Sequence, residues 1–386
     1  MANNNDNKVL NVPPLRFPEV SGEWKMCTIG ELTTKVGSGV TPRGGEAVYK
    51  TEGHPFVRSQ NVGLGNLLLD DIAFIDEETH LRQKNTELQF NDVLLNITGA
   101  SIGRSALVDK QIVGGNVNQH VCIIRTKENL VPSFICSFLL SNYGQRQIDS
   151  FQAGGNRQGL NFEQIKSIKI TIPSKDEQIK IAKLLRAIDE RIATQNKIID
   201  KLQSLIKGLR VCCMQRNGSN NVYLSEIAQI YQPQTISSAE LTEDGFLVYG
   251  ANGIIGKYKD YNHKTEQICI TCRGNTCGMV NYTKPMSWIT GNAMVINTDK
   301  YQDKVYKKYL YHYLSAYNFN SIISGSGQPQ IVRTPLEKLK ITLPTISEQK
   351  QKAMILDKIQ DKIEINHNIL NLYILQKQYL LRQMFI

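Results

Sequence analysis

Two long stretches of the chain share one pattern of apolar and polar positions. Between residues 172 and 214, apolar side chains from Ile181 and Leu185 onward follow alternating steps of four and three residues. The pattern returns between residues 343 and 385 at a constant offset of 171 residues. A 3.5-residue repeat is typical of a coiled-coil seam. We therefore predict two long helices that pair as an antiparallel coiled coil.

Each predicted seam carries a polar residue near its middle. Gln195 in the first helix and Asn366 in the second occupy equivalent positions of the repeat. An apolar seam residue would contribute about 1.5–3 kcal/mol by burial, so a polar pair sacrifices stability and mainly fixes register. We predict that these two side chains meet near a pseudo-two-fold axis. The pairing residues are Ile188, Ile192, Gln195, Ile199, Ile359, Ile363, Asn366 and Leu370.

The ends of the two helices differ in character. Each opens on a proline and on acidic residues that suit the positive helix end, and we predict Ser174 and Ser347 as their N-caps. The second seam is weaker because Lys352 and Lys377 interrupt it near its ends. Its hydrophobic C-terminus, residues 380–386, is a candidate for packing on a partner protein instead of on the first helix.

The segment before each long helix reads as short strands, turns and one helix. Residues 91–108 predict a β-hairpin whose turn is held open by Gly99 and Gly103, and residues 132–143 predict a helix. The second half repeats this order. The fold class is α+β, with two tandem-duplicated mixed α/β domains separated by two long helices. The boundaries are a disordered tail 1–14, domain 15–171, helix 172–216, domain 217–342 and helix 343–386.

Composition favours a cytoplasmic protein with an acidic partner. The 386 residues are 41% hydrophobic, which is enough for sizeable cores, and the formal net charge is +10. A basic surplus of this size favours nucleic acid. No secretory signal pattern and no long apolar run are present, so we expect no membrane contact.

Signatures of catalysis are absent from the sequence. There is no phosphate-binding GxxxxGK[ST] loop, no HExxH and no GxSxG. Cysteines 269, 272 and 277 form a CxxC and a third thiol, but in the repeat they match the apolar residues Leu94, Ile97 and Ile102. We therefore predict small buried hydrophobes, no metal site and no catalytic residue.

Polar side chains instead gather around glycines in the predicted loops. Arginine pairs with guanine, and asparagine or glutamine with adenine, in the major groove. The alternative is that these residues only solvate turns. The candidate DNA-binding residues are Arg58, Gln60, Asn61, Thr98, Ser101, Arg104, Asn118, Gln119, Asn156, Arg157, Gln158, Tyr249, Asn252, Arg273, Asn275, Asn292, Gln328, Gln330 and Arg333.

Several of these motifs together resemble a known family. The chain contains NITGASIGR followed by GGNVNQH, and a strand-to-helix junction that occurs twice, as ITIPSKDEQ and ITLPTISEQ. In these motifs it resembles the specificity (S) subunit of bacterial type I restriction–modification systems. The similarity covers nearly the whole chain after the tail.

The resemblance implies a non-catalytic subunit with two target recognition domains. Each would read one half of a split target in double-stranded DNA, while the helices set the spacing and dock two methyltransferase (M) subunits. Restriction (R) subunits would join them, and S-adenosylmethionine, ATP and Mg would belong to these partners, with no cofactor in this chain. Arg58-Ser59-Gln60 differs from Tyr249-Gly250-Ala251, so we predict an asymmetric target.

Two other functions are compatible with parts of the sequence. A structural or adaptor protein could present two ligand-binding modules on a coiled coil. The basic charge and the Arg/Asn/Gln-rich loops speak against it. A free-standing methyltransferase is disfavoured by the missing cofactor and catalytic motifs.

Overall fold

Two compact units make up the protein. The computed structural model describes residues 11–152, 159–214, 220–251, 253–325 and 327–386. Unit 1 comprises residues up to Asn196 together with Ile369–Ile386, and unit 2 comprises Lys197–Asn368. Each long helix therefore contributes residues to both units.

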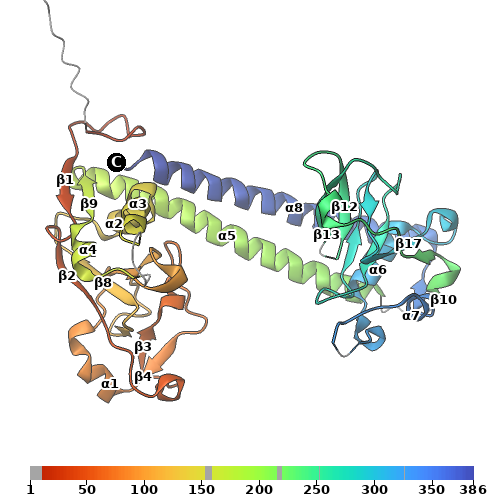
Figure 1. The fold of residues 1–386 in the computed structure, drawn as a ribbon, viewed down its shortest axis with the longest axis horizontal. Helices are drawn as coiled ribbons and strands as arrows, with labels where there is room; N and C mark the ends of the chain where they lie inside the picture. The colour runs from red at the N-terminus through yellow and green to blue at the C-terminus, as the bar shows by residue number, and fades with distance from the viewer. Residues whose placement is uncertain (1–10, 153–158, 215–219, 252, 326) are drawn as a thin grey trace, which may run out of the picture. The chain divides into compact units, whose positions relative to one another are not determined.

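The described residues of unit 1 form three small sheets and four short α-helices before the first long helix. Figure 1 shows these elements in red to yellow. The sheets have the strand orders β1-β9, β2-β8-β5-β6 and β4-β3-β7. The elements are β1 (Lys25–Thr28), β2 (Thr33–Ser38), β3 (His54–Val57), β4 (Ala73–Ile75), α1 (Glu77–Arg82), β5 (Val93–Asn96), β6 (Ser105–Leu107), β7 (Asn116–Val117), β8 (Val121–Thr126), α2 (Pro132–Leu140), α3 (Asn142–Ser150), α4 (Phe162–Ser167) and β9 (Lys169–Ile172), followed by α5 (Lys175–Met214).

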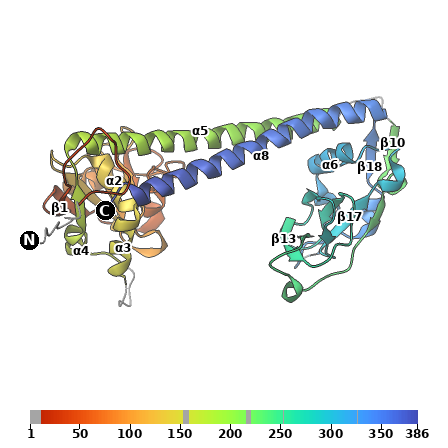
Figure 2. The ribbon, with the colours of Figure 1, turned by 90° about the horizontal axis from the view of Figure 1, so that it is seen from above.

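Unit 2 repeats these sheets with the strand orders β10-β18, β11-β17-β14-β15 and β13-β12-β16. Figure 2 shows β10 and β18 side by side next to the start of α8. The elements are β10 (Asn220–Tyr223), β11 (Gln229–Tyr231), β12 (Phe246–Gly250), β13 (Gly253–Tyr258), β14 (Ile268–Thr271), β15 (Val280–Tyr282), β16 (Trp288–Ile289), β17 (Ala293–Asn297), α6 (Lys307–Ala316), α7 (Arg333–Glu337), β18 (Lys340–Leu343) and α8 (Ile346–Gln383).

The duplication predicted from the sequence is confirmed strand by strand. In both units the three-stranded sheet combines one antiparallel and one parallel pair, and the four-stranded sheet is antiparallel throughout. The predicted hairpin at residues 91–108 is β5 and β6, and Gly99 and Gly103 have φ of +73° and +84°. Such values favour glycine because it lacks a Cβ.

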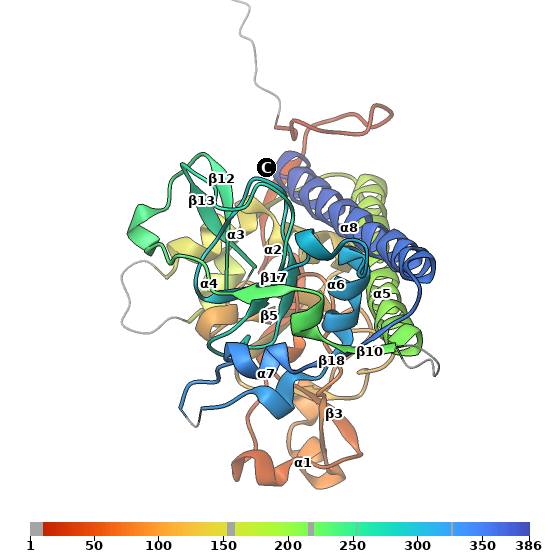
Figure 3. The ribbon, with the colours of Figure 1, turned by 90° about the vertical axis from the view of Figure 1, so that its right-hand side faces the viewer.

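One helix in each unit lies between the four-stranded sheet and the long helices. In unit 1, Phe134 and Phe138 of α2 share a core with β5 and with Leu185 of α5. In unit 2, Leu310 and Leu314 of α6 pack on the sheet, and Figure 3 shows α6 beside the long helices. In unit 1 the core therefore joins the sheet to the long helices, whereas in unit 2 α6 contacts α8 through a bond between His312 and Asp357 (3.0 Å).

The repeated EQ motif has a structural role that the two copies share. The side chain of Gln178 accepts a bond from Val131 N (2.8 Å) and donates to Asn129 O and Pro173 O (both 3.1 Å). Its counterpart Gln349 makes the same three kinds of bond, to residues 304, 306 and 344. Both glutamines are buried. Each one fixes the segment before α2 or α6 to the start of a long helix.

The N-cap prediction is right for the first long helix and wrong for the second. Ser174 Oγ accepts a bond from Glu177 N (3.4 Å) at the start of α5. At the start of α8 the cap is Thr345, whose Oγ1 accepts from Glu348 N (3.4 Å) while the Glu348 carboxylate accepts from Thr345 N. This reciprocal pair is a capping box. Ser347 lies inside the first turn, two residues beyond the position that the repeat offset assigns to the cap.

The antiparallel pairing of the long helices is confirmed within each unit. In unit 1, Asp189 of α5 forms an ion pair with Lys377 of α8 (2.6 Å), and two residues further along α5, Arg191 lies over the ring of Tyr373. The partner number falls as the α5 number rises, which defines antiparallel helices. The predicted seam residue Ile188 is buried in unit 1.

Unit 2 shows the same helix direction with different side chains. Arg210 of α5 bonds to Gln360 of α8, and Lys352 Nζ donates to Cys213 O (3.2 Å). The seam residues Ile359 and Ile363 pack with Ile206 in one cluster, and Ile199 is buried.

The polar seam residues lie in different units. Gln195 belongs to unit 1 and Asn366 to unit 2, and both are buried. Their meeting stays a prediction. Leu370, the last of the predicted pairing residues, is half-buried in unit 1.

The hydrophobic C-terminus packs within unit 1, contrary to the prediction that it packs on a partner protein. Leu380, Met384 and Phe385 are buried in the core of unit 1, where the Phe385 ring lies 5.2 Å from that of Phe134. The N-terminal segment closes over the same core, because Leu15 N donates to Gln383 O (3.0 Å). Asn11, at the start of the described chain, exchanges two bonds with Trp24.

Candidate nucleic-acid interface

A hairpin loop between β5 and β6, residues 97–104, is the centre of the candidate site in unit 1. Ile97 N donates to His120 O (3.0 Å), and Leu160 N donates to Ile97 O (2.8 Å). Asn96 Nδ2 donates to Ser59 O (2.8 Å) in the turn after β3. Three loops that are distant in sequence are thereby joined to one hairpin loop.

Unit 2 builds its hairpin loop, residues 272–279, with the same bonds. Cys272 N donates to Asn292 O and Ile331 N donates to Cys272 O, both at 3.0 Å. Thr271 Oγ1 donates to Ala251 O (2.6 Å) in the turn after β12. Glycines 274 and 278 have positive φ of +85° and +91°, at the positions of Gly99 and Gly103. The two units therefore share one loop frame.

This shared frame corrects one match made from the sequence. Asn118 N donates to Val57 O and Thr290 N donates to Tyr249 O, so Tyr249 corresponds to Val57 and not to Arg58. Gly291-Asn292 corresponds to residues 119–120, because the parallel strand pairs fix the alignment. The sequence match failed because the connecting loops differ in length.

Four of the predicted residues in unit 1 line one depression. Gln60, Thr98, Ser101 and Arg104 surround a shallow hollow of about 440 Å³, together with Ser59 and His120. Gln60 and Arg104 are exposed, as is Gln119 beside the hollow. The hollow presents hydrogen-bond donors and acceptors and one guanidinium group.

Three other predicted residues of unit 1 are engaged in shaping the loops. Arg58 donates to Asp71 O (2.6 Å) and lies over the ring of Tyr49. Asn61 is fully buried and donates to Leu68 O and to the carboxylate of Asp71, to which Gln60 is also hydrogen-bonded. Asn118 is buried, and its Oδ1 accepts from His120 N (3.0 Å). These contacts hold the turns in place.

The predicted residues of unit 2 also gather at its hairpin loop. Gly274 N donates to Pro329 O (3.0 Å), and Arg273 forms a β-bridge with Gln330. The loop at 327–331 is thus joined to the hairpin loop. The exposed candidates on these loops are Arg273, Asn275, Asn292, Gln328 and Gln330.

Two predicted residues of unit 2 have internal partners. Tyr249 is buried, its hydroxyl accepts from Lys284 N (3.1 Å), and burial raises its pKa. Arg333 forms an ion pair with Glu337 one turn along α7 (2.6 Å). The predicted residues Asn156, Arg157, Gln158 and Asn252 lie outside the described residues.

Comparison with known proteins identifies the family. A family model described as the type I restriction modification DNA specificity domain matches residues 21–204 and again residues 217–372. The chain belongs to the specificity subunits of type I restriction–modification systems.

Some relatives in this family resemble most of the chain, and others resemble about a third of it. The MjaVIII specificity subunit of Methanocaldococcus jannaschii is 25% identical to this chain, and the match covers 91% of this chain and 88% of that subunit. The EcoprrI specificity subunit of Escherichia coli is 32% identical over 35% of this chain and 34% of its own. The crystal structure of an S subunit from M. genitalium has a TM-score of 0.67 at 17% identity, covering 97% of this chain and 99% of that one. The last comparison shows a shared fold.

Two residues of this specificity subunit's loop frame were missed from the sequence. His120 lines the unit 1 hollow, and its Nδ1 lies 2.6 Å from Thr98 Oγ1. Met279 is 45% exposed in the unit 2 hairpin loop, at the position of Arg104. The GGNVNQH motif contains the histidine, so this signal was present. No sequence signal distinguishes Met279 from a core methionine.

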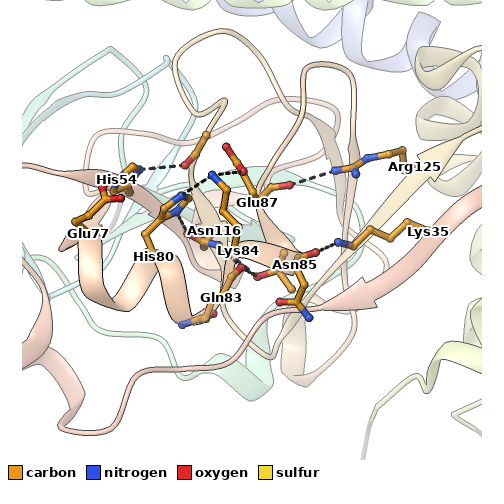
Figure 4. A network of polar contacts seen from close by, with 12 residues as sticks. Lys35, His54, Glu77, His80, Gln83, Lys84, Asn85, Glu87, Asn116 and Arg125 are labelled. Atoms are coloured by element: carbon orange, nitrogen blue, oxygen red, sulfur yellow. Dashed lines mark hydrogen bonds and ion pairs between the residues drawn. The ribbon is translucent and has the colours of Figure 1, made fainter.

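A second polar network of unit 1 supports the fold around α1 (Figure 4). The rings of His54 and His80 stack with centroids 3.8 Å apart. His54 bonds to Glu77 (2.6 Å), and His80 Nδ1 bonds to Asn116 Oδ1 (2.7 Å). Asn116 Nδ2 in turn donates to the backbone of Gln83. These internal bonds tie α1 to the three-stranded sheet β4-β3-β7.

Of the three cysteines predicted to be buried, Cys269 and Cys272 are buried and Cys277 is half-buried. Cys269 and Cys272 are buried in apolar clusters, and burial raises the pKa of Cys269 to about 12. A thiol in such surroundings stays protonated and unreactive. Within the described ranges, no group of three potential ligand side chains could hold a metal ion. In that same part of the chain, no helix is long and apolar enough to cross a membrane.

Proposed function

We propose that this specificity subunit is non-catalytic and that each unit reads one half of an asymmetric bipartite DNA target. The observation that carries this proposal is the loop frame, which is built twice with the same main-chain bonds and carries different exposed side chains. A repeated scaffold with different polar loops suits two readers of different sequences. In this proposal, units 1 and 2 each contain one target recognition domain.

The exposed side chains have the chemistry of base readout. Arg104 and Arg273 can each form two parallel bonds with guanine, and Asn275 and Gln330 can do the same with adenine. The net charge of +10 favours the phosphate backbone, which supplies affinity without sequence preference.

The two long helices set the spacing between half-sites in this proposal. The 40 residues of α5 correspond to a helix of about 60 Å. We propose that α5 and α8 also dock two methyltransferase (M) subunits, and that restriction (R) subunits complete the nuclease. S-adenosylmethionine, ATP and Mg would be bound by those partners, and the complex would act on DNA in the cytoplasm.

Co-expression with the methyltransferase subunit tests the proposal. The chain should co-purify with that subunit, and the complex should methylate a target whose two specified parts flank unspecified bases. The chain alone should methylate nothing.

Two results would overturn it. Methylation by the isolated chain would show a catalytic protein. A complex that binds all DNA sequences equally, or no DNA, would instead favour an adaptor that presents two ligand-binding modules on a coiled coil.

A further inference from the structure

The shared loop frame allows the side chains of the two units to be compared position by position. Ile97 and Cys272 are equivalent because each makes the same main-chain hydrogen bonds within its own unit. The two glycines of the hairpin loop follow at the same spacing in both units. Between and beside these fixed points the side chains differ. The pairs, unit 1 first, are Thr98 and Arg273, Ala100 and Asn275, Arg104 and Met279, Gln119 and Gly291, and His120 and Asn292.

Each hairpin loop carries one exposed arginine, but at opposite ends. Arg273 directly precedes the first glycine of its loop, whereas Arg104 directly follows the second glycine. The two guanidinium groups therefore start from different points of the same frame. If both units meet DNA with this frame, they contact base pairs at different positions of their half-sites.

In the other unit, the position equivalent to each arginine carries a smaller or apolar side chain. In unit 2, Met279 stands at the position of Arg104 and is 45% exposed. Its side chain is apolar, so contact with water does not explain a methionine at this position. An exposed apolar side chain in a reading loop suits the methyl group of thymine. Thr98 replaces Arg273 in unit 1, where its hydroxyl is held by His120 at 2.6 Å.

We propose that these two loop ends determine the base preference of each half-site. Arg104 reads a guanine in the half-site of unit 1, and Arg273 reads a guanine at the other loop end in the half-site of unit 2. Met279 contacts a thymine methyl at the position where unit 1 has its arginine. This assignment rests on the proposed function, because it requires that the hairpin loops enter a DNA groove.

The test uses the full chain in complex with its methyltransferase subunit and a randomised double-stranded DNA library. Arg104→Met should reduce discrimination at one base pair of one half-site by about 10-fold to 100-fold, the range for one lost bidentate pair. Preference in the other half-site should not change. Arg273→Thr should have the matching effect in the other half-site only.

An exchange of both loop ends tests the shared frame itself. Thr98→Arg with Arg104→Met gives unit 1 the pattern of unit 2, so its guanine preference should move to another base pair. Arg82→Met is the control, since Arg82 is an exposed arginine of α1 paired with Glu78. The control should retain the wild-type preference.

The outcomes separate this inference from the proposed function. If Arg104→Met and Arg273→Thr weaken binding to all library members equally, or leave the preferences unchanged, the assignment is wrong although the wild-type complex still selects a target. If the wild-type complex selects no sequence, the proposed function itself fails. Arg104 and Arg273 are exposed, so the single variants remain informative even if Thr98→Arg prevents folding.

Discussion

Replacing Gln178 by alanine tests whether the repeated EQ motif anchors each unit to its long helix. The side chain is 1% exposed. Its amide N–H groups and its carbonyl oxygen form hydrogen bonds with the backbone of residues 129, 131 and 173. Alanine removes these bonds and leaves the N–H of Val131, a half-buried residue, without its acceptor. We expect unit 1 to lose stability, with its fold retained.

The expected loss follows from the three bonds. Each of the three bonds contributes about 1 kcal/mol net. We therefore expect the free energy of unfolding of unit 1 to fall by about 3 kcal/mol. With a urea m-value of about 1–3 kcal/mol per M, the unfolding midpoint should fall by about 1–3 M.

The two tryptophans allow unit 1 to be followed separately. Trp24 is buried in unit 1, where its ring lies 6.0 Å from that of Phe134 in α2. Trp288 lies in unit 2. In a Trp288→Phe background, urea unfolding followed by fluorescence reports the core that Gln178 fixes.

Two further variants define the cause. Gln178→Glu keeps an acceptor for Val131 but turns oxygens toward two carbonyl groups. Burial should raise the pKa of the introduced carboxyl, so the variant should be least stable near pH 7 and recover as the pH falls and a proton restores one donor. Lys183→Ala, on the exposed side of the same helix, should change stability by less than about 0.5 kcal/mol. If Gln178→Ala unfolds with the wild-type midpoint, the anchoring argument is wrong.

Three further predictions concern unit 2. Thr345→Ala should cost about 1 kcal/mol in urea unfolding because it removes the cap of α8, whereas Ser347→Ala should cost little; equal effects would contradict the cap assignment. Burial holds the pKa of His312 below its ordinary value, so its contribution to stability is present above pH 6.5 and is lost as the pH falls through the lowered pKa; unfolding curves between pH 7 and pH 5 measure this loss, which should disappear in His312→Gln. At pH 8 a thiol reagent should modify the exposed Cys212 and spare the buried Cys269, and rapid labelling of Cys269 in the folded protein would contradict its burial.

The sequence predicted the long helices well because their signal is local and repeated. A 3.5-residue pattern over about 40 residues leaves few alternatives to a paired helix, and the constant offset makes two such helices equivalent. The cap of α8 was missed although the offset itself points from Ser174 to Thr345. Ser347 is a good cap residue by type, but helix position decides which side chain meets a free N–H.

Prediction of the candidate site was less complete, and the reason lies in the loops. Residue type alone cannot separate Asn61, which is buried and bonded to Asp71, from Gln60, which is exposed next to it. The sequence match between the two units was wrong in the turns after β3 and β12, because insertions change the numerical offset between equivalent residues. Only the strand pairing restored the alignment.

By itself, the sequence determined the duplication, the two long helices and the family, because periodicity and repeated motifs are properties of the chain order. The tertiary structure decided which polar residues face solvent and which side chains occupy equivalent points of the two hairpin loops. It also placed the hydrophobic C-terminus in the core of unit 1, next to Phe134. These outcomes depend on backbone bonds between residues far apart in sequence, such as Ile97 with His120, whose energies no local pattern encodes.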